Sequence, residues 1–212
     1  MTTTLQETDL IREAAEWRMI SLLFECPKGA WFERVAALTG DVTDPDLNAA
    51  AAFAAEEAGE GAYHSIFGPG GPAPGREISY RDWVQPGYLL SELAAFYDAF
   101  AYRPDTAEVP DHIAVETGFI SYLRVKEAFA REFGETENAE IAASAAATFA
   151  REHLAKFATQ ISSALGHSGY DYLRLAGEGL LKRVGPDPDK KARPALPVLE
   201  DIDDPLFECG QL

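Results

Sequence analysis

Two carboxylates and an imidazole lie together in the stretch Glu108-Val109-Pro110-Asp111-His112. Pro110 favours an extended chain before a helix, and Asp111 has the side chain with which an N-cap accepts a backbone N–H bond. The same groups could instead bind a basic peptide, because carboxylates form strong charge-assisted hydrogen bonds with arginine. Local chemistry alone favours ordinary capping, with peptide binding as its functional rival.

An apolar group precedes this stretch, where Tyr63, Ile66 and Phe67 share one face of a predicted helix. Their spacing alone favours a core anchor that closes the helix. The glycine- and proline-rich segment 68–75 follows directly. A phosphate-binding loop needs a preceding strand, and a Lys with a Ser or Thr after its last glycine. Segment 68–75 has neither, so we predict a surface loop.

The other potential nucleophiles and metal ligands form no recognised motif. Ser168 directly follows His167, and adjacent residues cannot supply the geometry of a catalytic triad. Cys26 is expected where the first helix ends, a position that does not activate a thiol, and Cys209 is far from it in the sequence. No HExxH motif occurs, and no glutamate stands three residues before any of the histidines, which are His64, His112, His153 and His167. We therefore expect no catalytic residue and no metal site.

Apolar residues at helical spacing must position these groups, and no stretch alternates as a half-buried strand does. Asp44 and Pro45 read as the N-cap and first position of an alanine-rich helix. The first predicted helix ends at Phe24. The others are predicted from about Ala30 to Gly40, from Pro45 through Phe53, from Leu89 to Phe100, from near Asp111 to Gly134, from Ile141 to Leu165, and around Leu173 to Leu180. The fold should be an all-α, single-domain helical bundle over residues 1–184.

Residues 185–212 are rich in proline and acidic side chains, a composition that predicts a mobile tail. A minority alternative is an acidic arm that covers a basic or apolar groove. The whole chain has 212 residues, of which 47% are hydrophobic, enough for a folded core. Its 18 basic against 35 acidic residues give a net charge of −17, which argues against nucleic acid and anionic membranes as partners. Without a secretory signal or an apolar spanning run, we expect a cytoplasmic protein.

The two groups of residues, in this order and separated by the loop, resemble the TorD/DmsD/NarJ family of redox-enzyme maturation chaperones. That family has an aromatic-x-x-Leu-Phe element, matched here by Tyr63 to Phe67, and a Glu-x-x-Asp-His element, matched by Glu108 to His112. Ile66 and Ile113 stand where the family pattern more often has leucine. The resemblance spans roughly Trp17 to Leu180.

The resemblance implies an all-helical cytoplasmic chaperone that binds the precursor of a molybdenum oxidoreductase at its twin-arginine leader or another N-terminal segment. Such a chaperone holds the catalytic subunit until molybdopterin cofactor is inserted, delays its export, and has no catalytic activity of its own. Glu108, Asp111 and His112 become candidates for precursor contact, and Tyr63, Ile66 and Phe67 for shaping the groove. It implies at most transient contact with molybdopterin cofactor or a guanine nucleotide, and either a monomer or a dimer.

Two other classes of function stay open. One is a helical nucleotide-binding enzyme or hydrolase that uses Asp111 and His112 as acid and base. The other is a structural adaptor that pairs through its aromatic stripes. The client is equally open among enzymes for nitrate, dimethyl sulfoxide, trimethylamine oxide, chlorate, selenate and hydrocarbons.

Overall fold

The computed structural model describes residues 2–189, and the regular secondary structure of that range is helical. A single isolated β-bridge, between Arg76 and His112, accompanies the helices there. The elements are α1 (Thr2–Leu23), α2 (Trp31–Leu38), α3 (Pro45–Glu57), α4 (Glu60–Phe67), the 3-10 helix η1 (Glu77–Tyr80), α5 (Pro86–Ala99), α6 (Ile113–Glu132), α7 (Thr136–Phe149), the π segment η2 (Ala150–Leu154), α8 (Ala155–Leu165) and α9 (Asp171–Val184). The predicted all-α fold is confirmed.

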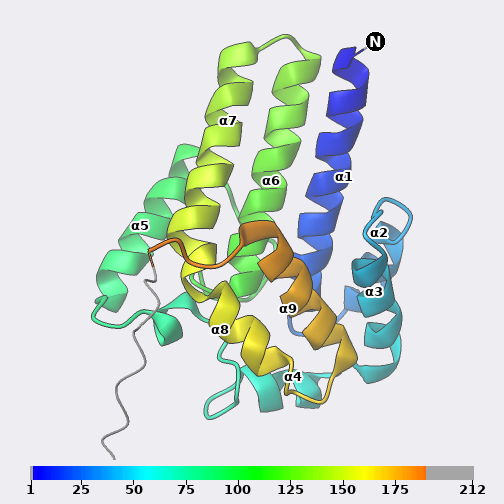
Figure 1. The fold of residues 1–212 in the computed structure, drawn as a ribbon, viewed down its shortest axis with the longest axis vertical. Helices are drawn as coiled ribbons and strands as arrows, with labels where there is room; N and C mark the ends of the chain where they lie inside the picture. Colours follow the sequence, from blue (N-terminus) through cyan, green and yellow to red (C-terminus); the bar gives the residue numbers. More distant parts are fainter. Residues whose placement is uncertain (1, 190–212) are drawn as a thin grey trace, which may run out of the picture.

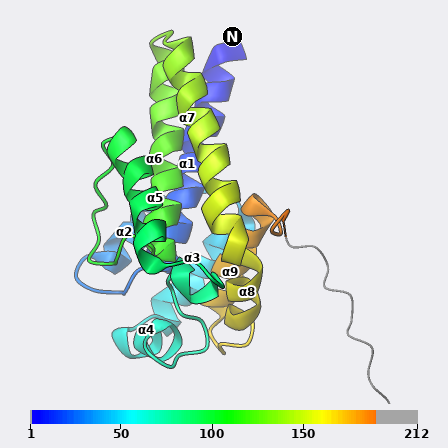
Figure 2. The same cartoon turned by 90° about the vertical axis from the view of Figure 1, so that its left-hand side faces the viewer.

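Helices α1, α6 and α7 lie side by side along the long axis of the molecule (Figures 1 and 2). The Ser21 hydroxyl donates to the Ala114 carbonyl and the Ser121 hydroxyl to the Ala14 carbonyl, each at 2.8 Å. A β carbon at Gly118 would lie 3.1 Å from Ser21 Oγ, so glycine permits this close approach of α1 and α6. Among the described helices, none has both the length and the apolar character needed to cross a membrane.

The other end of the molecule is built from α3, α4, α8 and α9 (Figure 1). Helix α3 begins as predicted, with Pro45 at its first position and the Asp44 carboxylate accepting the Asp46 N–H at 3.0 Å. The second oxygen of Asp44 accepts hydrogen bonds from Lys182 and Arg183 in the last turn of α9, at 3.1 and 3.2 Å. Asp44 therefore caps α3 and fastens α9 to it.

The helix predicted from Ile141 to Leu165 is wrong at its start and in its interior. It begins at Thr136, which adds a turn that buries Ala139 completely. Segment Ala150–Leu154 is a π turn, in which the hydrogen bonds span one more residue than in an α-helix. Apolar spacing did not show this change because both halves keep an apolar face.

The aromatic stripe of α5 lies against the core. Leu89 and Leu93 are fully buried, and Phe96 and Phe100 are half-buried. The ring of Phe96 meets that of Phe149 edge to face, with centroids 5.2 Å apart. Most of this stripe is therefore used in packing α5 and is not free to bind a partner.

The predicted mobile tail, 185–212, lies mostly outside the described residues, which end at 189. Its described beginning contacts the first turn of α8, where Lys156 Nζ donates to Asp187 at 2.9 Å and to Asp189 at 2.5 Å. This contact agrees with the acidic-arm alternative for residues 185–189. Mobility of the remainder stays a prediction.

Candidate functional site

The end of the Gly/Pro loop is hydrogen-bonded to the start of α6. Segments 75–77 and 111–113 run antiparallel, with the Arg76–His112 bridge at their centre. Two backbone N–H···O bonds of 2.8 Å flank this bridge. The pairing brings the loop and the Glu108 to His112 stretch into one site.

Asp111 is completely buried and forms an ion pair with Arg76. Nε of Arg76 lies 3.0 Å from both carboxylate oxygens, and Nη2 lies 3.0 Å from Oδ1. The prediction that Asp111 caps α6 is wrong, because its carboxylate is held by this guanidinium. His112 is the N-cap instead, and its Nδ1 accepts the Ala114 N–H at 3.2 Å.

His112 begins a chain of hydrogen bonds that ends at Glu108. Since Nδ1 accepts a bond in the cap, the ring proton belongs on Nε2, which lies 3.2 Å from the Tyr63 hydroxyl. Tyr63 in turn donates to Glu108 Oε1 at 2.7 Å. Burial lowers the pKa of His112, and burial together with Glu108 raises the pKa of Tyr63. Both groups are therefore neutral at physiological pH, as this chain of bonds requires.

Gly75 lies directly against the His112 ring. A β carbon at this position would come within 2.2 Å of His112 Nε2 and 2.7 Å of Cδ2. Any other residue would push the imidazole away from Tyr63 or pull the loop off α6. Position 75 therefore requires glycine, because the His112 ring packs against it. The sequence pattern did not indicate this requirement.

Tyr63, Ile66 and Phe67 all lie on the buried face of α4, with exposed fractions of 6%, 5% and 9%. The Phe67 ring packs against His112 at a centroid distance of 6.2 Å and against Phe24 of the segment after α1 at the same distance. The structure thus places these three side chains behind the cap, where they support it.

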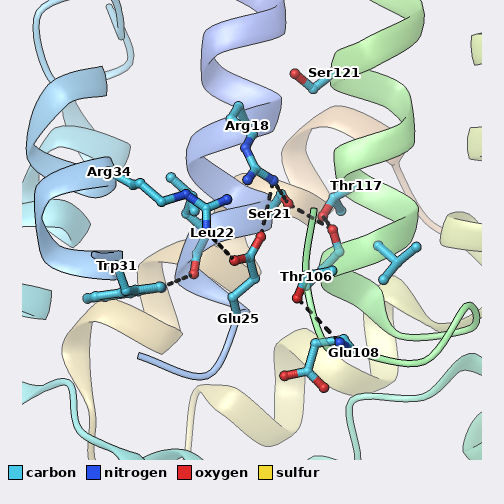
Figure 3. Close-up of polar contacts among 12 residues, drawn as sticks. Arg18, Ser21, Leu22, Glu25, Trp31, Arg34, Thr106, Glu108, Thr117 and Ser121 are labelled. Carbon is cyan, nitrogen blue, oxygen red and sulfur yellow. Dashed lines mark hydrogen bonds and ion pairs between the residues drawn. The ribbon is translucent and has the colours of Figure 1, made fainter. Parts of the chain in front are cut away.

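Glu108 is the outermost of the three candidate contact residues, since 19% of its side chain is exposed and Asp111 and His112 are buried. Its N–H bonds to the Thr106 hydroxyl at 3.3 Å (Figure 3). The neighbouring Val109 is 43% exposed. This short segment presents a carboxylate and an apolar side chain to solvent.

A second charged group, missed from the sequence, lies at the end of α1. The buried Glu25 carboxylate binds Arg18 at 3.1 Å and Arg34 of α2 at 3.2 Å (Figure 3). Burial raises the pKa of Glu25 and the two arginines oppose this effect. Only the fold brings these residues together, because they lie on different elements and match no motif.

A buried polar cluster lies behind segment 75–77. Glu77 is completely buried and forms an ion pair with Arg81, and its other oxygen lies 3.0 Å from His153 Nδ1 in the π segment. Glu116, one turn into α6, is also completely buried. Burial, with Glu77 and Asp111 nearby, raises the pKa of Glu116 well above its ordinary value and so favours the neutral form of this carboxyl.

A cavity of about 660 Å³ opens beside this cluster. Arg81, Arg151 and Lys156 supply cations to its wall, and Phe96 and Phe100 supply aromatic surface. Three carboxylates, Glu92, Glu152 and Asp189, line it as well, and Asp189 is one of the two acidic partners of Lys156. The cavity therefore combines charges of both signs with aromatic surface, and its cations come from three segments that no local motif connects.

Acid–base catalysis by Asp111 and His112 does not fit this geometry. Each ring nitrogen of His112 already has a partner, Ala114 or Tyr63, and Asp111 is bound to Arg76. A general base needs a free lone pair within reach of its substrate. The arrangement instead gives α6 an N-cap formed by a neutral histidine, beside one partly exposed carboxylate, that of Glu108.

A family model described as nitrate reductase delta subunit matches residues 36–163, more than half of the chain. The matched range contains all six candidate residues, from Tyr63 to His112, and the buried Glu77 cluster. No curated protein and no solved structure shows a significant match.

Proposed function

Since this chain belongs to the nitrate reductase delta subunit family, a family of molybdoenzyme maturation chaperones, we propose that it binds the precursor of one catalytic subunit. The client would be a molybdenum enzyme of the DMSO-reductase family, recognised at its twin-arginine leader or N-terminal segment. Binding in the cytoplasm would hold the subunit until its cofactor is inserted and would delay export. The family match carries this proposal, and the site geometry supports binding without turnover.

Glu108 would form the precursor contact itself, and the buried Asp111 and His112 would hold this segment in position. Glu108 would bind a leader arginine directly, because its carboxylate is partly exposed and charge-assisted bonds to guanidinium are strong. Both carboxylate oxygens of Asp111 accept hydrogen bonds from the guanidinium of Arg76, so a guanidinium is already bound within this site. His112 would fix the position of Glu108 through Tyr63.

Any contact with molybdopterin cofactor or a guanine nucleotide would be transient and would accompany insertion. The cavity beside the π segment is one place where described residues offer cations and aromatic rings to such a ligand, although carboxylates line it as well. Its described acidic contact, between Lys156 and Asp189, would have to open first.

The proposed function predicts that the chain, purified from its native host, brings down a molybdenum catalytic subunit that lacks its cofactor. The reason is that a maturation chaperone binds the precursor and releases the loaded enzyme. Mass spectrometry of the captured subunit and its metal content provide the measurement. Capture of a cofactor-loaded subunit, or nucleotide turnover by the pure chain, would instead favour one of the alternative functions.

Glu108→Gln is expected to weaken binding of a twin-arginine leader peptide by about 1–2 kcal/mol, roughly 5- to 30-fold in Kd. The change removes the accessible charge but keeps an acceptor for the Tyr63 hydroxyl. Calorimetric titration measures the effect, which should shrink with added salt.

Glu140→Gln is the matched control, because it removes one negative charge from an exposed position on α7. Asp111→Ala and His112→Ala should also weaken peptide binding, and thermal unfolding of each variant separates that effect from lost stability. Binding that is unchanged in all three site variants would exclude this site assignment.

A further inference from the structure

Three side chains with metal-ligating atoms meet beside the end of α1. Cys26 lies on the segment after this helix, and Glu60 and His64 lie on α4. The Cys26 sulfur, a Glu60 oxygen and a His64 ring nitrogen are all within 4.8 Å of one another. The fold therefore brings together a thiol, a carboxylate and an imidazole. Cys26 is far from the other two in the sequence, and Glu60 and His64 belong to no recognised metal-binding motif.

Small side-chain rotations would bring these atoms around one small cation. Bonds of roughly 2.0–2.3 Å in tetrahedral geometry place neighbouring ligand atoms less than about 4 Å apart. Glu60 and His64 are four residues apart, so they share one face of α4, and both are exposed and can rotate. Cys26 is a half-buried free thiol packed against the core, and it provides a fixed point.

The donor set selects the class of metal. Sulfur and nitrogen ligands favour Zn²⁺ and similar first-row ions, whereas Mg²⁺ and Ca²⁺ require oxygen ligands. We propose that Cys26, Glu60 and His64 bind a Zn²⁺-type ion, with water or a group from a partner in the fourth position. This inference concerns residues outside the proposed precursor contact and does not depend on that function.

One cation already lies at this cluster. Lys28 is 3.3 Å from Glu60, but both side chains are more than half exposed, so this pair is weak and easily replaced.

The proposed ion would lie next to the precursor site. The ring of His64 contacts that of Tyr63 at a centroid distance of 5.3 Å, and the Tyr63 hydroxyl donates to Glu108. Metal binding would join α4 to the end of α1 and bring positive charge near Glu108. An ion bound by Cys26, Glu60 and His64 would therefore change the electrostatic potential around Glu108, where a leader would bind.

Titration of untagged, chelator-treated full-length protein with Co²⁺ tests the proposal. We expect one ion per chain, with the visible bands of tetrahedral Co²⁺ and a near-ultraviolet thiolate-to-metal charge-transfer band. Competition against a chromophoric chelator then gives the Zn²⁺ affinity. Cys26→Ser should abolish the charge-transfer band, and Glu60→Gln and His64→Ala should each weaken Zn²⁺ binding at least about tenfold, since even outer-shell changes cost that much.

Two controls match these variants. Cys209→Ser removes the other thiol of the chain, and Glu56→Gln removes an exposed carboxylate from α3. Neither should alter the spectrum or the affinity. A charge-transfer band that survives in Cys26→Ser, or Zn²⁺ binding of equal strength in all variants, would overturn the proposal, and because no leader is present neither result depends on the proposed function.

Discussion

Glu77→Ala is expected to lower the free energy of unfolding by about 3–5 kcal/mol, the usual cost of removing one partner from a buried ion pair. Glu77 is completely buried, and its loss would leave Arg81 and His153 without their shared acceptor. Removing the Glu77 charge also relieves its repulsion with neighbouring acidic groups, but this offsets little of the loss. Burial favours the neutral form of Glu116, and Asp111 is already paired with Arg76. Urea unfolding followed by circular dichroism measures the change.

A double variant provides the control for this prediction. Replacing the whole pair, with Glu77→Leu and Arg81→Met, removes both charges together and should recover much of the lost stability. If Glu77→Ala and the double variant are equally unstable, the lost acceptor of His153, which both variants lack, rather than the unpaired Arg81 is responsible. A loss below about 1 kcal/mol in Glu77→Ala would contradict the buried network itself.

Glu116→Gln is expected to stabilise the protein at neutral and alkaline pH and to have little effect in acid. The folded protein holds the Glu116 proton more tightly than the unfolded chain, whose carboxyl has an ordinary pKa near 4.5. The stability contributed by this group is therefore complete below that pKa and is lost as the pH rises towards the folded value, by about 1.4 kcal/mol for each pH unit. Glutamine is neutral throughout and removes this loss.

Unfolding of both proteins at about pH 5 and about pH 8 measures the difference. The free energy of unfolding of Glu116→Gln should rise relative to that of the parent protein as the pH rises. The exposed control Glu140→Gln should show no such trend. A stability difference that is the same at both pH values would mean that Glu116 does not bind its proton more tightly in the folded state.

Helix positions were predictable where the local signal was strong. The Asp44-Pro45 start of α3 needs only neighbouring residues to specify it. The end of α2 was placed at Gly40, but the helix ends at Leu38 with Thr39 as its C-cap. The N-cap of α6 was misplaced by one residue, because Asp111 has good capping chemistry but its carboxylate binds Arg76, a residue in a distant loop. A local rule cannot anticipate a competing partner that only the tertiary fold supplies.

The same limit applies to the site. The association of Tyr63 with Glu108 and His112 followed from the family resemblance, and the structure joins them with hydrogen bonds. The contributions of Gly75 and Arg76 could not be inferred, since each depends on an atom contact across the fold. The proximity of Cys26 to Glu60 and His64 could not be inferred either, because more than thirty residues separate Cys26 from α4 in the sequence.

The π turn at Ala150–Leu154 sets the rotational phase of everything after it. One extra residue in a helical turn rotates the following side chains by about 100° relative to an uninterrupted α-helix. With this offset Phe157 and Ile161 point into the core while Phe149 does so from α7. If the present sequence formed a regular α-helix here, α8 would rotate by about 100° and its buried face would leave the core. Deleting one residue would remove the extra residue and keep the buried faces of α7 and α8 in phase, so the π turn is what lets both faces reach the core at the present chain length.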